Sequence, residues 1–443
     1  MTGVCAPGYA EEQIRARART GGAAVFPDRA DYGSVLFGAG GGALGGAGGV
    51  PGVHDELDAL RLVPPVFVPH RLERMLELGE EPLPQHVELE CEFGGFRAPL
   101  PVYVSAFGST QVAASDLGVA VGRQAGRLGI PMVIGENVVP VTGYGRLDGD
   151  DARGSLLSRI ASYQEAGGSA GGVVVQQSTQ DADAEVWNLV YSDPTASRLL
   201  EEGRLAFELK VGQGAKPGLG GLTVLRREAA ARLSDQYRTG EIYGPEADAV
   251  LRYGTPGTFT EEILRQQIRL MRNNYPRARV WVKLPPGRDV TLAAEVAWEA
   301  GADAVTVDGA EGGSGWAPSA FFDHVGLPLG ECLSRIPARD RSLLASGRIW
   351  EGARAAKCLA LGATAVGLGR AALLAADEDP EDGLVRLVDA LRLELRLLIS
   401  ALGKYRPRDL STDDVWLPQP MSLRPHFTSL HDASEPLTSG VGK

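Results

Sequence analysis

Residues 342–373 read SLLASGRIWEGARAAKCLALGATAVGLGRAAL, and this stretch decides the fold class. An apolar run (342–347) is followed by a helical pattern that stops at glycine (352–362) and by a second apolar run (363–369). Glycine just after a helical pattern is a common helix stop. Short apolar strands that alternate with helices are typical of parallel βα units. The stretch therefore predicts two consecutive βα units.

The same alternation begins at residue 101 and predicts eight strands. They are 101–106, 131–135, 172–177, 205–211, 279–284, 303–308, 342–347 and 363–369. Helical patterns lie between many of them and after the last one, at 114–129, 155–167, 260–274, 292–301, 352–362 and 384–402. Eight strands with helical crossovers close a barrel more readily than they form an open sheet. We therefore predict an α/β fold, a (β/α)₈ TIM barrel with an N-terminal cap and a short C-terminal tail.

This pattern divides the chain into an N-terminal extension (1–95), the barrel (96–405) and a C-terminal tail (406–443). In the extension, GAGGGALGGAGG at 38–49 predicts a flexible linker, because it buries too little apolar surface to offset its backbone entropy. Four further local elements are expected there: a helix at 11–19, a helix at 55–62, then a Pro-rich extended run, and a hairpin within 86–100.

The net charge of −12 and the isoelectric point of about 5.2 limit the partners of this chain. Nucleic acids and anionic membranes both require basic surfaces, so we expect neither. Small anionic ligands remain compatible, because a local site can be positive on an acidic protein. The chain has no apolar run of about 18 residues, and its start lacks the apolar core of a signal peptide, which predicts a cytoplasmic protein.

The four cysteines, at positions 5, 91, 332 and 358, form no CxxC pair, and their spacing suits neither zinc nor an iron–sulfur cluster. The six histidines are scattered, and none belongs to an HExxH motif. We therefore predict reduced, mostly structural thiols and no metal site.

The active site of a (β/α)₈ barrel is built from the loops that follow the strands. The loops after the seventh and eighth strands carry Ser346, Gly347, Arg348, Gly367, Gly369 and Arg370. Glycine lets backbone N–H groups approach an anion, and the helix N-terminus that follows adds positive potential. These two loops are the recurring phosphate site of the fold, so we predict a phosphorylated ligand there. The alternative is that the glycines only turn the chain.

Two further strand ends carry candidates. Asp308 ends the sixth strand, and four glycines follow within 309–315, which suggests close approach to a flat or phosphorylated ligand. Lys283 lies near the end of the fifth strand, and a lysine in an apolar strand is rarely buried without a partner. A flavin N1–O2 edge, which becomes negative on reduction, would be such a partner. A structural ion pair is the alternative.

The loop after the fourth strand, GQGAKPGLGG at 212–221, carries Gln213 and Lys216. A lysine at the barrel mouth can hold a substrate carboxylate as a point charge. The alternative for Lys216 is a solvated side chain on a mobile loop.

Six strings, in this order, resemble the FMN-binding barrel of glutamate synthases over about residues 95–405. They are GQGAKPGLGG (212–221), VKLPPG (282–287), VDGAEGGSG (307–315), HVGLP (324–328), ASGRIWEGARAAKCLALGA (345–363) and GLGRAAL (367–373). The first is the most specific, because it resembles the family pattern GQGAKPGxGG almost letter for letter. Within the family, the segment from VGQGAKPG to LAADEDP (211–380) resembles the stand-alone large subunit of N-methylglutamate synthase more than the long multidomain enzyme.

The resemblance implies FMN as the cofactor and a role for each matched position. The positions expected to line or hold FMN are Ser105, Ala106, Phe107, Gln176, Gln177, Lys283, Asp308, Gly312, Gly313, Ser346, Gly347, Arg348, Gly367, Gly369 and Arg370. Lys283 would contact the ring edge or the ribityl chain, and the glycines would admit the phosphate. Gln213 and Lys216 would hold a 2-oxo acid or amino acid over the flavin, with Glu136 at the mouth of the second strand.

The chain also departs from the complete enzymes of that family. Only about 100 residues precede the barrel, too few for a glutaminase domain, and the family's iron–sulfur cysteines are missing between Gly369 and Leu402. Glu311 stands where the family has Asp, and Trp316 and Arg370 stand where smaller residues are expected. We therefore expect partner subunits that supply ammonia or electrons, and a homo-oligomer.

Three functions are compatible with these residues. The first is an FMN-dependent oxidoreductase that forms or oxidises an amino acid, or an N-substituted amino acid, by hydride exchange at flavin N5. The second is a redox-neutral flavoenzyme, an isomerase or lyase. The third is a non-catalytic ligand-binding subunit, because fold does not determine function. The presence of both Lys216 and Lys283 favours an enzyme.

Overall fold

The structure, a computed structural model, describes residues 4–6, 8–27, 55–107, 117–136, 150–178, 185–220, 222–232, 238–312, 317–337 and 340–416. The glycine-rich linker at 38–49, Gly313, Trp316 and the tail beyond residue 416 lie outside these ranges.

Eight parallel strands close into one barrel, in the order β4-β5-β6-β7-β11-β12-β13-β14. Their bounds are β4 Val102–Phe107, β5 Met132–Ile134, β6 Val173–Ser178, β7 Leu205–Lys210, β11 Arg279–Leu284, β12 Ala304–Asp308, β13 Leu343–Ser346 and β14 Ala365–Leu368. The predicted fold class is confirmed, and so are all eight predicted strands. The two apolar runs from which the fold class was predicted, 342–347 and 363–369, form β13 and β14, which pair in parallel.

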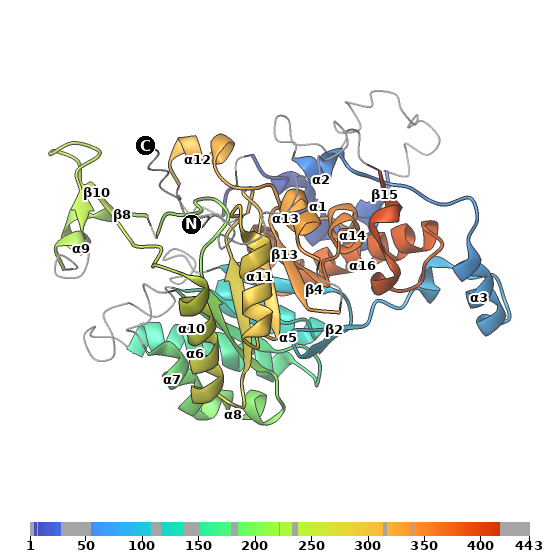
Figure 1. Cartoon of the computed structure of the whole chain (residues 1–443), viewed down its shortest axis with the longest axis horizontal. Coiled ribbons are helices and arrows are strands. Elements are labelled where there is room, and N and C mark those ends of the chain that lie inside the picture. The colour runs from blue at the N-terminus through green and yellow to red at the C-terminus, as the bar shows by residue number, and fades with distance from the viewer. Residues whose placement is uncertain are drawn as a thin grey trace, which may run out of the picture.

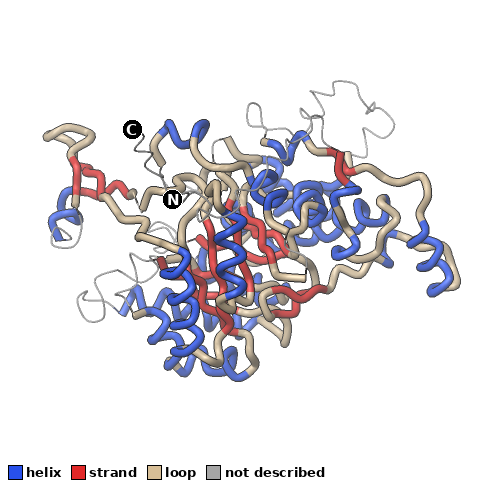
Figure 2. Tube along the Cα trace, viewed as in Figure 1, coloured by secondary structure: helices blue, strands red, loops and turns tan. Residues whose placement is uncertain are grey.

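Helices surround these strands on the outside of the barrel (Figures 1 and 2). They are α5 Leu117–Leu128, α6 Asp150–Ala166, α7 Val186–Ser192, α8 Pro194–Glu201, α10 Glu261–Asn274, α11 Val290–Glu299, α13 Leu329–Arg335, α14 Gly352–Ala360, α15 Arg370–Glu378 and α16 Gly383–Ala401. The short helix α12 (Ser319–His324) instead lies beyond the end of the strands, in the connection from β12 to α13 (Figure 1). Every helix predicted between the strands is confirmed. Among the helices of the described ranges, none is long and apolar enough to cross a membrane.

The predicted hairpin closes the amino-terminal end of the barrel. It consists of β2 (Cys91–Phe93) and β3 (Phe96–Ala98), joined at Gly94 and Gly95, whose φ angles of 57° and 82° suit a tight two-residue turn. Phe96 packs against Trp281 of β11 with ring centroids 5.5 Å apart, and the Trp281 indole N–H donates to the carbonyl of Gly94 at 3.0 Å. This end of the barrel is therefore a sealed apolar core.

The N-terminal extension packs along the outside of the barrel. The predicted helix at 11–19 is confirmed as α1 (Glu11–Thr20), followed by the short helix η1 (Gly21–Val25). Arg15 pairs with Asp377 at 2.9 Å, and Arg17 pairs with Glu394 at 2.6 Å, so α1 is tied to α15 and α16.

Two expectations for the extension were wrong. The helix expected at 55–62 is only α2 (Glu56–Ala59), because Arg61–Leu62 forms strand β1, which pairs with β15 (Val415–Trp416) of the tail. The run expected to be extended contains α3 (Pro69–Leu78). Pro69 occupies the first helical position, where a missing N–H costs nothing, so proline here starts a helix instead of preventing one.

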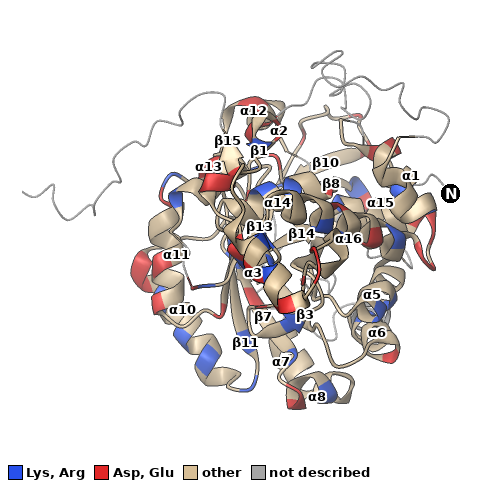
Figure 3. Ribbon diagram, turned by 90° about the vertical axis from the view of Figure 1, so that its right-hand side faces the viewer, with Lys and Arg blue, Asp and Glu red and all other residues tan. Residues whose placement is uncertain are grey.

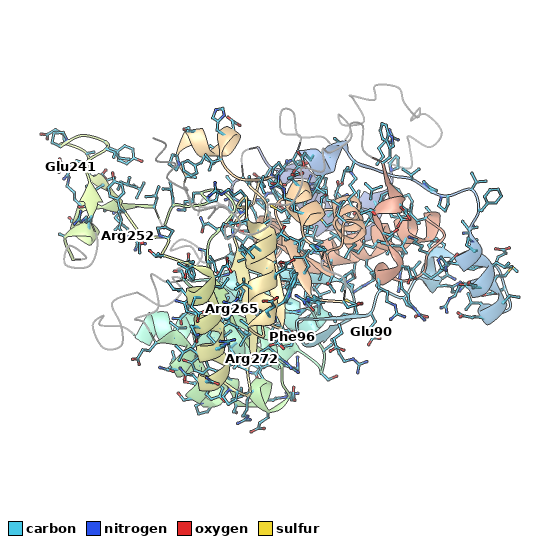
Figure 4. All side chains as sticks on the ribbon, viewed as in Figure 1. Glu90, Phe96, Glu241, Arg252, Arg265 and Arg272 are labelled. Carbon is cyan, nitrogen blue, oxygen red and sulfur yellow. The ribbon has the colours of Figure 1, made fainter. Side chains whose placement is uncertain are left out.

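An insertion that the sequence pattern did not predict separates β7 from α10. It contains β8 (Thr223–Arg226), α9 (Arg227–Arg232), β9 (Thr239–Gly240) and β10 (Ala249–Arg252), which form a three-stranded antiparallel sheet with α9. Figure 1 shows it projecting from the open end of the barrel, and Figure 4 labels its Arg252 far from Phe96 of the closing hairpin. Three short 3₁₀ turns lie outside the barrel strands and helices: η3 (Pro84–His86), η5 (Pro407–Asp409) and η6 (Thr412–Asp414).

Candidate functional site

Polar side chains occupy the barrel interior toward the carboxyl ends of the strands. Alternate residues of a strand point to opposite faces, so positions two apart share the interior. The buried polar residues of this layer are Ser105, Gln176, Glu208, Lys283, Thr306, Asp308 and Ser346. Each stands two or four residues after an apolar residue of the sealed end, as Lys283 follows Trp281. Six of the eight strands thus bring together side chains that the sequence spreads over about 240 residues.

Glu208 on β7 is the centre of one hydrogen-bond group. The Gln176 amide donates to one carboxylate oxygen at 2.5 Å, and the Thr306 hydroxyl donates to the other at 2.9 Å. Burial raises the pKa of the Glu208 carboxyl, and the nearby Lys283 ammonium opposes this shift. Glu208 was not among the expected site residues, although the strand text LAFELKV places two charged residues, Glu208 and Lys210, on one face of an apolar strand.

Lys283 and Asp308 form a buried ion pair, with Nζ and Oδ2 3.1 Å apart. Burial lowers the pKa of Lys283, but the carboxylates of Asp308 and Glu208 outweigh it, so the pKa lies above its ordinary value. The backbone N–H of Gly214 donates to the same Asp308 oxygen at 3.1 Å. Lys283 was expected to bind either a flavin edge or a carboxylate of the chain. The ion pair with Asp308 is the second of these two arrangements. The second oxygen of Asp308, Oδ1, is buried and has no hydrogen-bond partner within the part of the chain that the structure describes.

The loop after β7 brings Lys216 to the same end of the barrel. Its ammonium donates to the carbonyl of Leu222 at 3.2 Å, and only 4% of the residue is exposed. Burial lowers the pKa of Lys216 to about 8, and the neighbouring Lys210 ammonium contributes to the shift. Lys210 itself forms an ion pair with Glu136, which follows β5, and this pair lowers the pKa of the Glu136 carboxyl against the effect of burial. Gln213 is half-buried on the Lys216 loop.

The glycines of three loops pack against one another. A Cβ added at Gly214 would lie 2.1 Å from the carbonyl oxygen of Gly309, and one added at Gly312 would lie 3.0 Å from the Cα of Gly347. The loops after β7, β12 and β13 therefore touch through their backbones. Close loop packing, in addition to any ligand, explains why the GQGAKPG and DGAEGG strings need glycine at these positions.

Strand geometry divides the residues that were expected to line a flavin. Gln176 faces the interior, whereas Gln177 shares the outer face with Val175 and pairs with Leu209, two residues of the helix-facing core. A bulge in β4 sets Val104 opposite Met132 and Phe107 opposite Ile134, so Phe107 also packs toward the helices. Ser105 keeps its interior position, with its hydroxyl 2.9 Å from that of Ser346. Ala106 packs against the interior cluster.

The loops after β13 and β14 offer backbone groups suited to an anion. Gly347 has φ 146°, a conformation that favours glycine. Gly369 is the N-cap of α15, its helix start accepts no side-chain cap at that residue among the described residues, and a Cβ added at Gly369 would meet none of their atoms within 4 Å. A helix N-terminus preceded by glycine is a suitable site for phosphate, because the first N–H groups of a helix have no acceptor in the preceding turn. Gly367, in contrast, lies tightly against Tyr103 and Ser105, where a Cβ would be 2.6 Å from the Tyr103 ring.

The guanidinium of Arg348 is held by the N-terminal extension. It lies 3.0 Å from Asp55, and Arg354 of α14 also binds Asp55, at 2.6 Å. Asp58 completes this group, 2.5 Å from Arg354. Asp55 at the start of α2 therefore anchors the loop after β13, a role that no sequence pattern indicated. Burial raises the pKa of the Tyr9 phenol to about 12, and Arg370, which starts α15, is one of three nearby arginines that oppose this shift. Flavin contacts by these two arginines stay predictions.

Glu311, the residue expected in place of the family's Asp, caps a helix. Its carboxylate accepts the backbone N–H of Leu329 at 3.1 Å, at the start of α13. Burial raises the pKa of the Glu311 carboxyl to about 7, and Asp55 adds to the shift. Within the described residues, no group of three or more His, Cys, Asp or Glu side chains is arranged to hold a metal ion.

The fold is a (β/α)₈ barrel, and the candidate site residues lie at the carboxyl ends of its strands and on the loops that follow them. Residues 195–377 match the family described as the conserved region in glutamate synthase. The chain carries this conserved glutamate synthase region and is a distant homologue of archaeal-type glutamate synthases. This match contains β7, β11, β12, β13 and β14 together with the Lys216 loop.

Two curated relatives show the range of this similarity. The chain is 35% identical over 185 residues to the archaeal-type glutamate synthase [NADPH] of Dehalococcoides mccartyi, a match that covers 40% of this chain and 36% of that protein. It is also 35% identical over 129 residues to the isopentenyl-diphosphate delta-isomerase of Vibrio campbellii, covering 26% of this chain and 38% of that one. The chain thus spans only about a third of the length of the curated glutamate synthases that it matches.

Two solved structures share the fold. The (S)-mandelate dehydrogenase of Pseudomonas putida superposes with a TM-score of 0.53 at 19% identity, covering 93% of this chain and 99% of that one. The flavin-binding domain of baker's yeast flavocytochrome b2 superposes with a TM-score of 0.53 at 18% identity, covering 87% and 84%. At these identities the likeness concerns the barrel fold alone.

Proposed function

We propose that this protein binds FMN non-covalently and acts as a glutamate synthase-like oxidoreductase on an α-amino or α-imino acid. The observation that carries the proposal is that one barrel end combines two lysines with a helix, α15, that starts at a glycine. Lys283 is buried in the interior beside Asp308, and Lys216 lies on the GQGAKPG loop near them. The matched glutamate synthases and the flavin-binding domain of flavocytochrome b2 support the same assignment by analogy.

The residues present fit FMN. The start of α15 at Gly369, together with Gly347 at the end of the neighbouring strand β13, would hold a single terminal phosphate, whereas FAD would need room for a second nucleotide. Gln176 and Lys283 would face the ring from the interior, and Asp308 Oδ1, which accepts no hydrogen bond from the described residues, would be an available acceptor. When bound, FMN would supply hydride exchange with the substrate carbon.

The chain itself would position the substrate. Lys216 would hold the substrate carboxylate, assisted by the Gln213 amide from the same loop. With a pKa of about 8, the Lys216 ammonium is charged at neutral pH and can make that contact. The surrounding burial strengthens the contact, because a charge-assisted hydrogen bond gains from a drier site.

The absorption spectrum of the purified protein tests the cofactor. We expect the two flavin bands, released on denaturation as FMN, and neither stoichiometric iron nor acid-labile sulfide. The four free cysteines lie apart, with Cys91 in the closing hairpin and Cys358 inside α14, so they do not form a cluster ligand set. A colourless protein that gains no band when mixed with FMN would refute the proposal.

A redox-neutral isomerase or lyase is the second candidate. The similarity to an isopentenyl-diphosphate delta-isomerase favours it. Anaerobic mixing separates the two functions: amino or N-substituted amino acids that bleach the flavin band support the oxidoreductase. If none bleaches it while a candidate substrate is isomerised without net redox change, the second function holds.

We further propose partner subunits that supply ammonia or electrons, because the match covers only 36% of the length of the Dehalococcoides mccartyi synthase. Co-purification from the source cell, followed by a glutamate-forming assay of the complex, tests this part. An isolated chain that turns over with a nicotinamide cofactor alone would contradict it.

A further inference from the structure

Arg348, in the loop after β13, has a backbone conformation that arginine rarely adopts. Its φ is 50°, in the left-handed region, and it follows Gly347, whose φ is 146°. In the left-handed region the Cβ of a non-glycine residue crowds its own backbone, so the conformation persists only where other contacts hold it. Among the described residues, Glu185 and Asp340 are the only other non-glycine residues with a positive φ. The loop therefore carries a local strain that a partner of Arg348 must offset.

That partner is Asp55, in the N-terminal extension. Arg348 Nη1 lies 3.0 Å from Asp55 Oδ2, and only 9% and 10% of the two side chains are exposed. The two residues are 293 positions apart in the sequence. The second carboxylate of α2, that of Asp58, is more distant from Arg348, at 3.7 Å. Water and salt screen a buried pair weakly, so the Asp55 contact is strong enough to hold the arginine in its strained conformation.

Asp55 is itself held from several sides. Its carboxylate caps α2 by accepting the Asp58 N–H at 3.1 Å, and it accepts two hydrogen bonds from Arg354 of α14, at 2.6 and 2.8 Å. Leu57 is fully buried, and the Lys357 ammonium donates to its carbonyl at 2.7 Å. Helix α2 lies beside α13 and α14 in two perpendicular views (Figures 1 and 3). The carboxylate that the loop arginine meets is thus fixed in position.

The same contacts make the Arg348 side chain a poor ligand for an anion, although the sequence indicated a flavin contact. Its guanidinium belongs to a group of two arginines and two aspartates whose charges cancel: Arg348, Arg354, Asp55 and Asp58. A group without net charge attracts a phosphate weakly, and withdrawing the arginine would leave Asp55 buried with one cation fewer. Arg348 is therefore suited to act on a phosphate through the path of its backbone.

We infer that Asp55 and Arg348 are positioning residues: their ion pair holds the loop after β13 in the conformation that binds the cofactor phosphate, and the guanidinium does not contact the phosphate. The inference rests on the proposed FMN site, where Gly347 and the start of α15 hold that group. Because β13 and β14 are neighbouring strands, the path of the first loop sets the distance between these two backbone donors. A preformed loop binds more tightly than one that must be ordered on binding.

Two substitutions of Arg348 separate a positioning role from a direct contact. Arg348→Gly and Arg348→Ala remove the same charge, but only glycine adopts a φ of 50° without strain. Titration of FMN into the flavin-free protein, followed by flavin fluorescence, gives the dissociation constants. We expect Arg348→Gly to stay within about threefold of the wild type and Arg348→Ala to raise the constant about tenfold, the factor that corresponds to one strained left-handed residue. A phosphate ligand would be lost equally in both variants.

Asp55→Asn tests the anchor, because asparagine remains a good N-cap for α2 and only the charge is removed. It should raise the FMN dissociation constant about three- to tenfold, and Arg348→Gly in the same chain should restore the affinity. Asp58→Asn is the matched control: it removes a carboxylate from the same helix, 3.7 Å from Arg348, and should change the affinity less than about twofold. Riboflavin, which lacks the phosphate, should bind the wild type and all variants alike. Matching melting curves show that each variant folds.

Equal FMN affinities of Arg348→Gly and Arg348→Ala, weakened or not, would overturn the inference. So would Asp55→Asn with wild-type affinity, a loss that Asp58→Asn reproduces, or a parallel loss of riboflavin binding. Each of these results leaves the proposed function intact as long as the wild type binds FMN. A wild-type protein that binds no FMN would overturn the proposed function and this inference together.

Discussion

The two ends of this barrel are built from the same eight strands, but one end has an apolar interior and the other a polar and charged one. At the amino-terminal end the interior residues are Tyr103, Val133, Val174, Ala206, Trp281, Ala304, Leu344 and Ala365, and the β2–β3 hairpin closes over them. Two residues further along the strands the interior becomes Ser105, Gln176, Glu208, Lys283, Thr306 and Ser346. A shift of two positions, about 7 Å along a strand, thus separates an apolar core from a layer of buried charge.

The contrast separates the residues that stabilise the fold from the polar residues of the candidate site. Apolar burial at the closed end stabilises the fold, whereas buried ion pairs contribute little net stability because desolvation offsets their attraction. The buried pair Lys283–Asp308 therefore contributes little to the stability of the fold and is a good candidate for a functional role. Variants at the two ends should separate these roles.

Lys283→Met should have the largest effect, because it damages both stability and cofactor binding. Removing the ammonium leaves Asp308 and Glu208 buried without their cation, which costs roughly 3–5 kcal/mol of unfolding free energy. We also expect the FMN content to fall. Denaturant unfolding and the flavin-to-protein absorbance ratio measure the two effects. The double variant Lys283→Met/Asp308→Asn should regain part of the stability but not the flavin, and a variant that keeps full FMN content would contradict the placement of Lys283.

Trp281→Ala should destabilise the protein by about 3–5 kcal/mol without a specific effect on the flavin. Its ring is fully buried and contacts Phe93, Phe96 and Tyr103, so truncation leaves a cavity at the closed end. Trp416→Ala is the control, because that tryptophan is 51% exposed and should change stability little. If the folded Trp281→Ala protein lost FMN selectively, the two ends would not be separable.

Lys216→Met should leave FMN bound and raise KM, or lower kcat/KM, by about 10–100-fold. That range corresponds to the loss of roughly 1.5–3 kcal/mol for a charge-assisted contact to a carboxylate. Steady-state kinetics with the substrate identified by flavin bleaching provide the measurement. Loss of FMN in Lys216→Met, together with normal turnover in Lys283→Met, would show that the two lysines have been assigned the wrong roles.

The smallest predicted effect is on the pH profile. Burial lowers the pKa of Lys216 to about 8, so its ammonium is charged below that pH and loses its proton as the pH rises through it. KM should therefore be flat below about pH 7 and rise up to about tenfold between pH 8 and 9. The rise should be absent in Lys216→Met. A wild-type profile that stays flat to pH 9.5 would mean that Lys216 does not bind the substrate in its charged form.

Much of the fold follows from local patterns. Apolar runs that alternate with helices predict all eight barrel strands, because a parallel strand buried on both faces is apolar along its length. The candidate site was only partly predictable. Lys283 stands out as a charge in such a strand, but Glu208 and Lys210 carry the same signal and were overlooked. The choice between Gln176 and Gln177 needs the register of β6, and the outward turn of Phe107 needs the bulge in β4.

Other features arise from contacts between distant segments. The chain position of Asp55 gives no indication that it binds Arg348 and Arg354, roughly 300 residues away. The insertion β8–β10 escaped prediction because its short, charge-rich elements lack a clear periodicity. Helix α3 was missed because the prolines before it suggested an extended run, although Leu72, Met75 and Leu76 have helical spacing.

By itself, the sequence determined the barrel, the loops that follow its strands and the glutamate synthase-like motifs on them. These are properties of consecutive residues, and short-range sterics and apolar periodicity suffice to encode them. Only the tertiary structure decided which charges meet: Lys283 with Asp308, Lys210 with Glu136, and Asp55 with the loop after β13. Barrel closure brings these groups together from distant parts of the chain, and the energy of a buried charge depends on its neighbours in space.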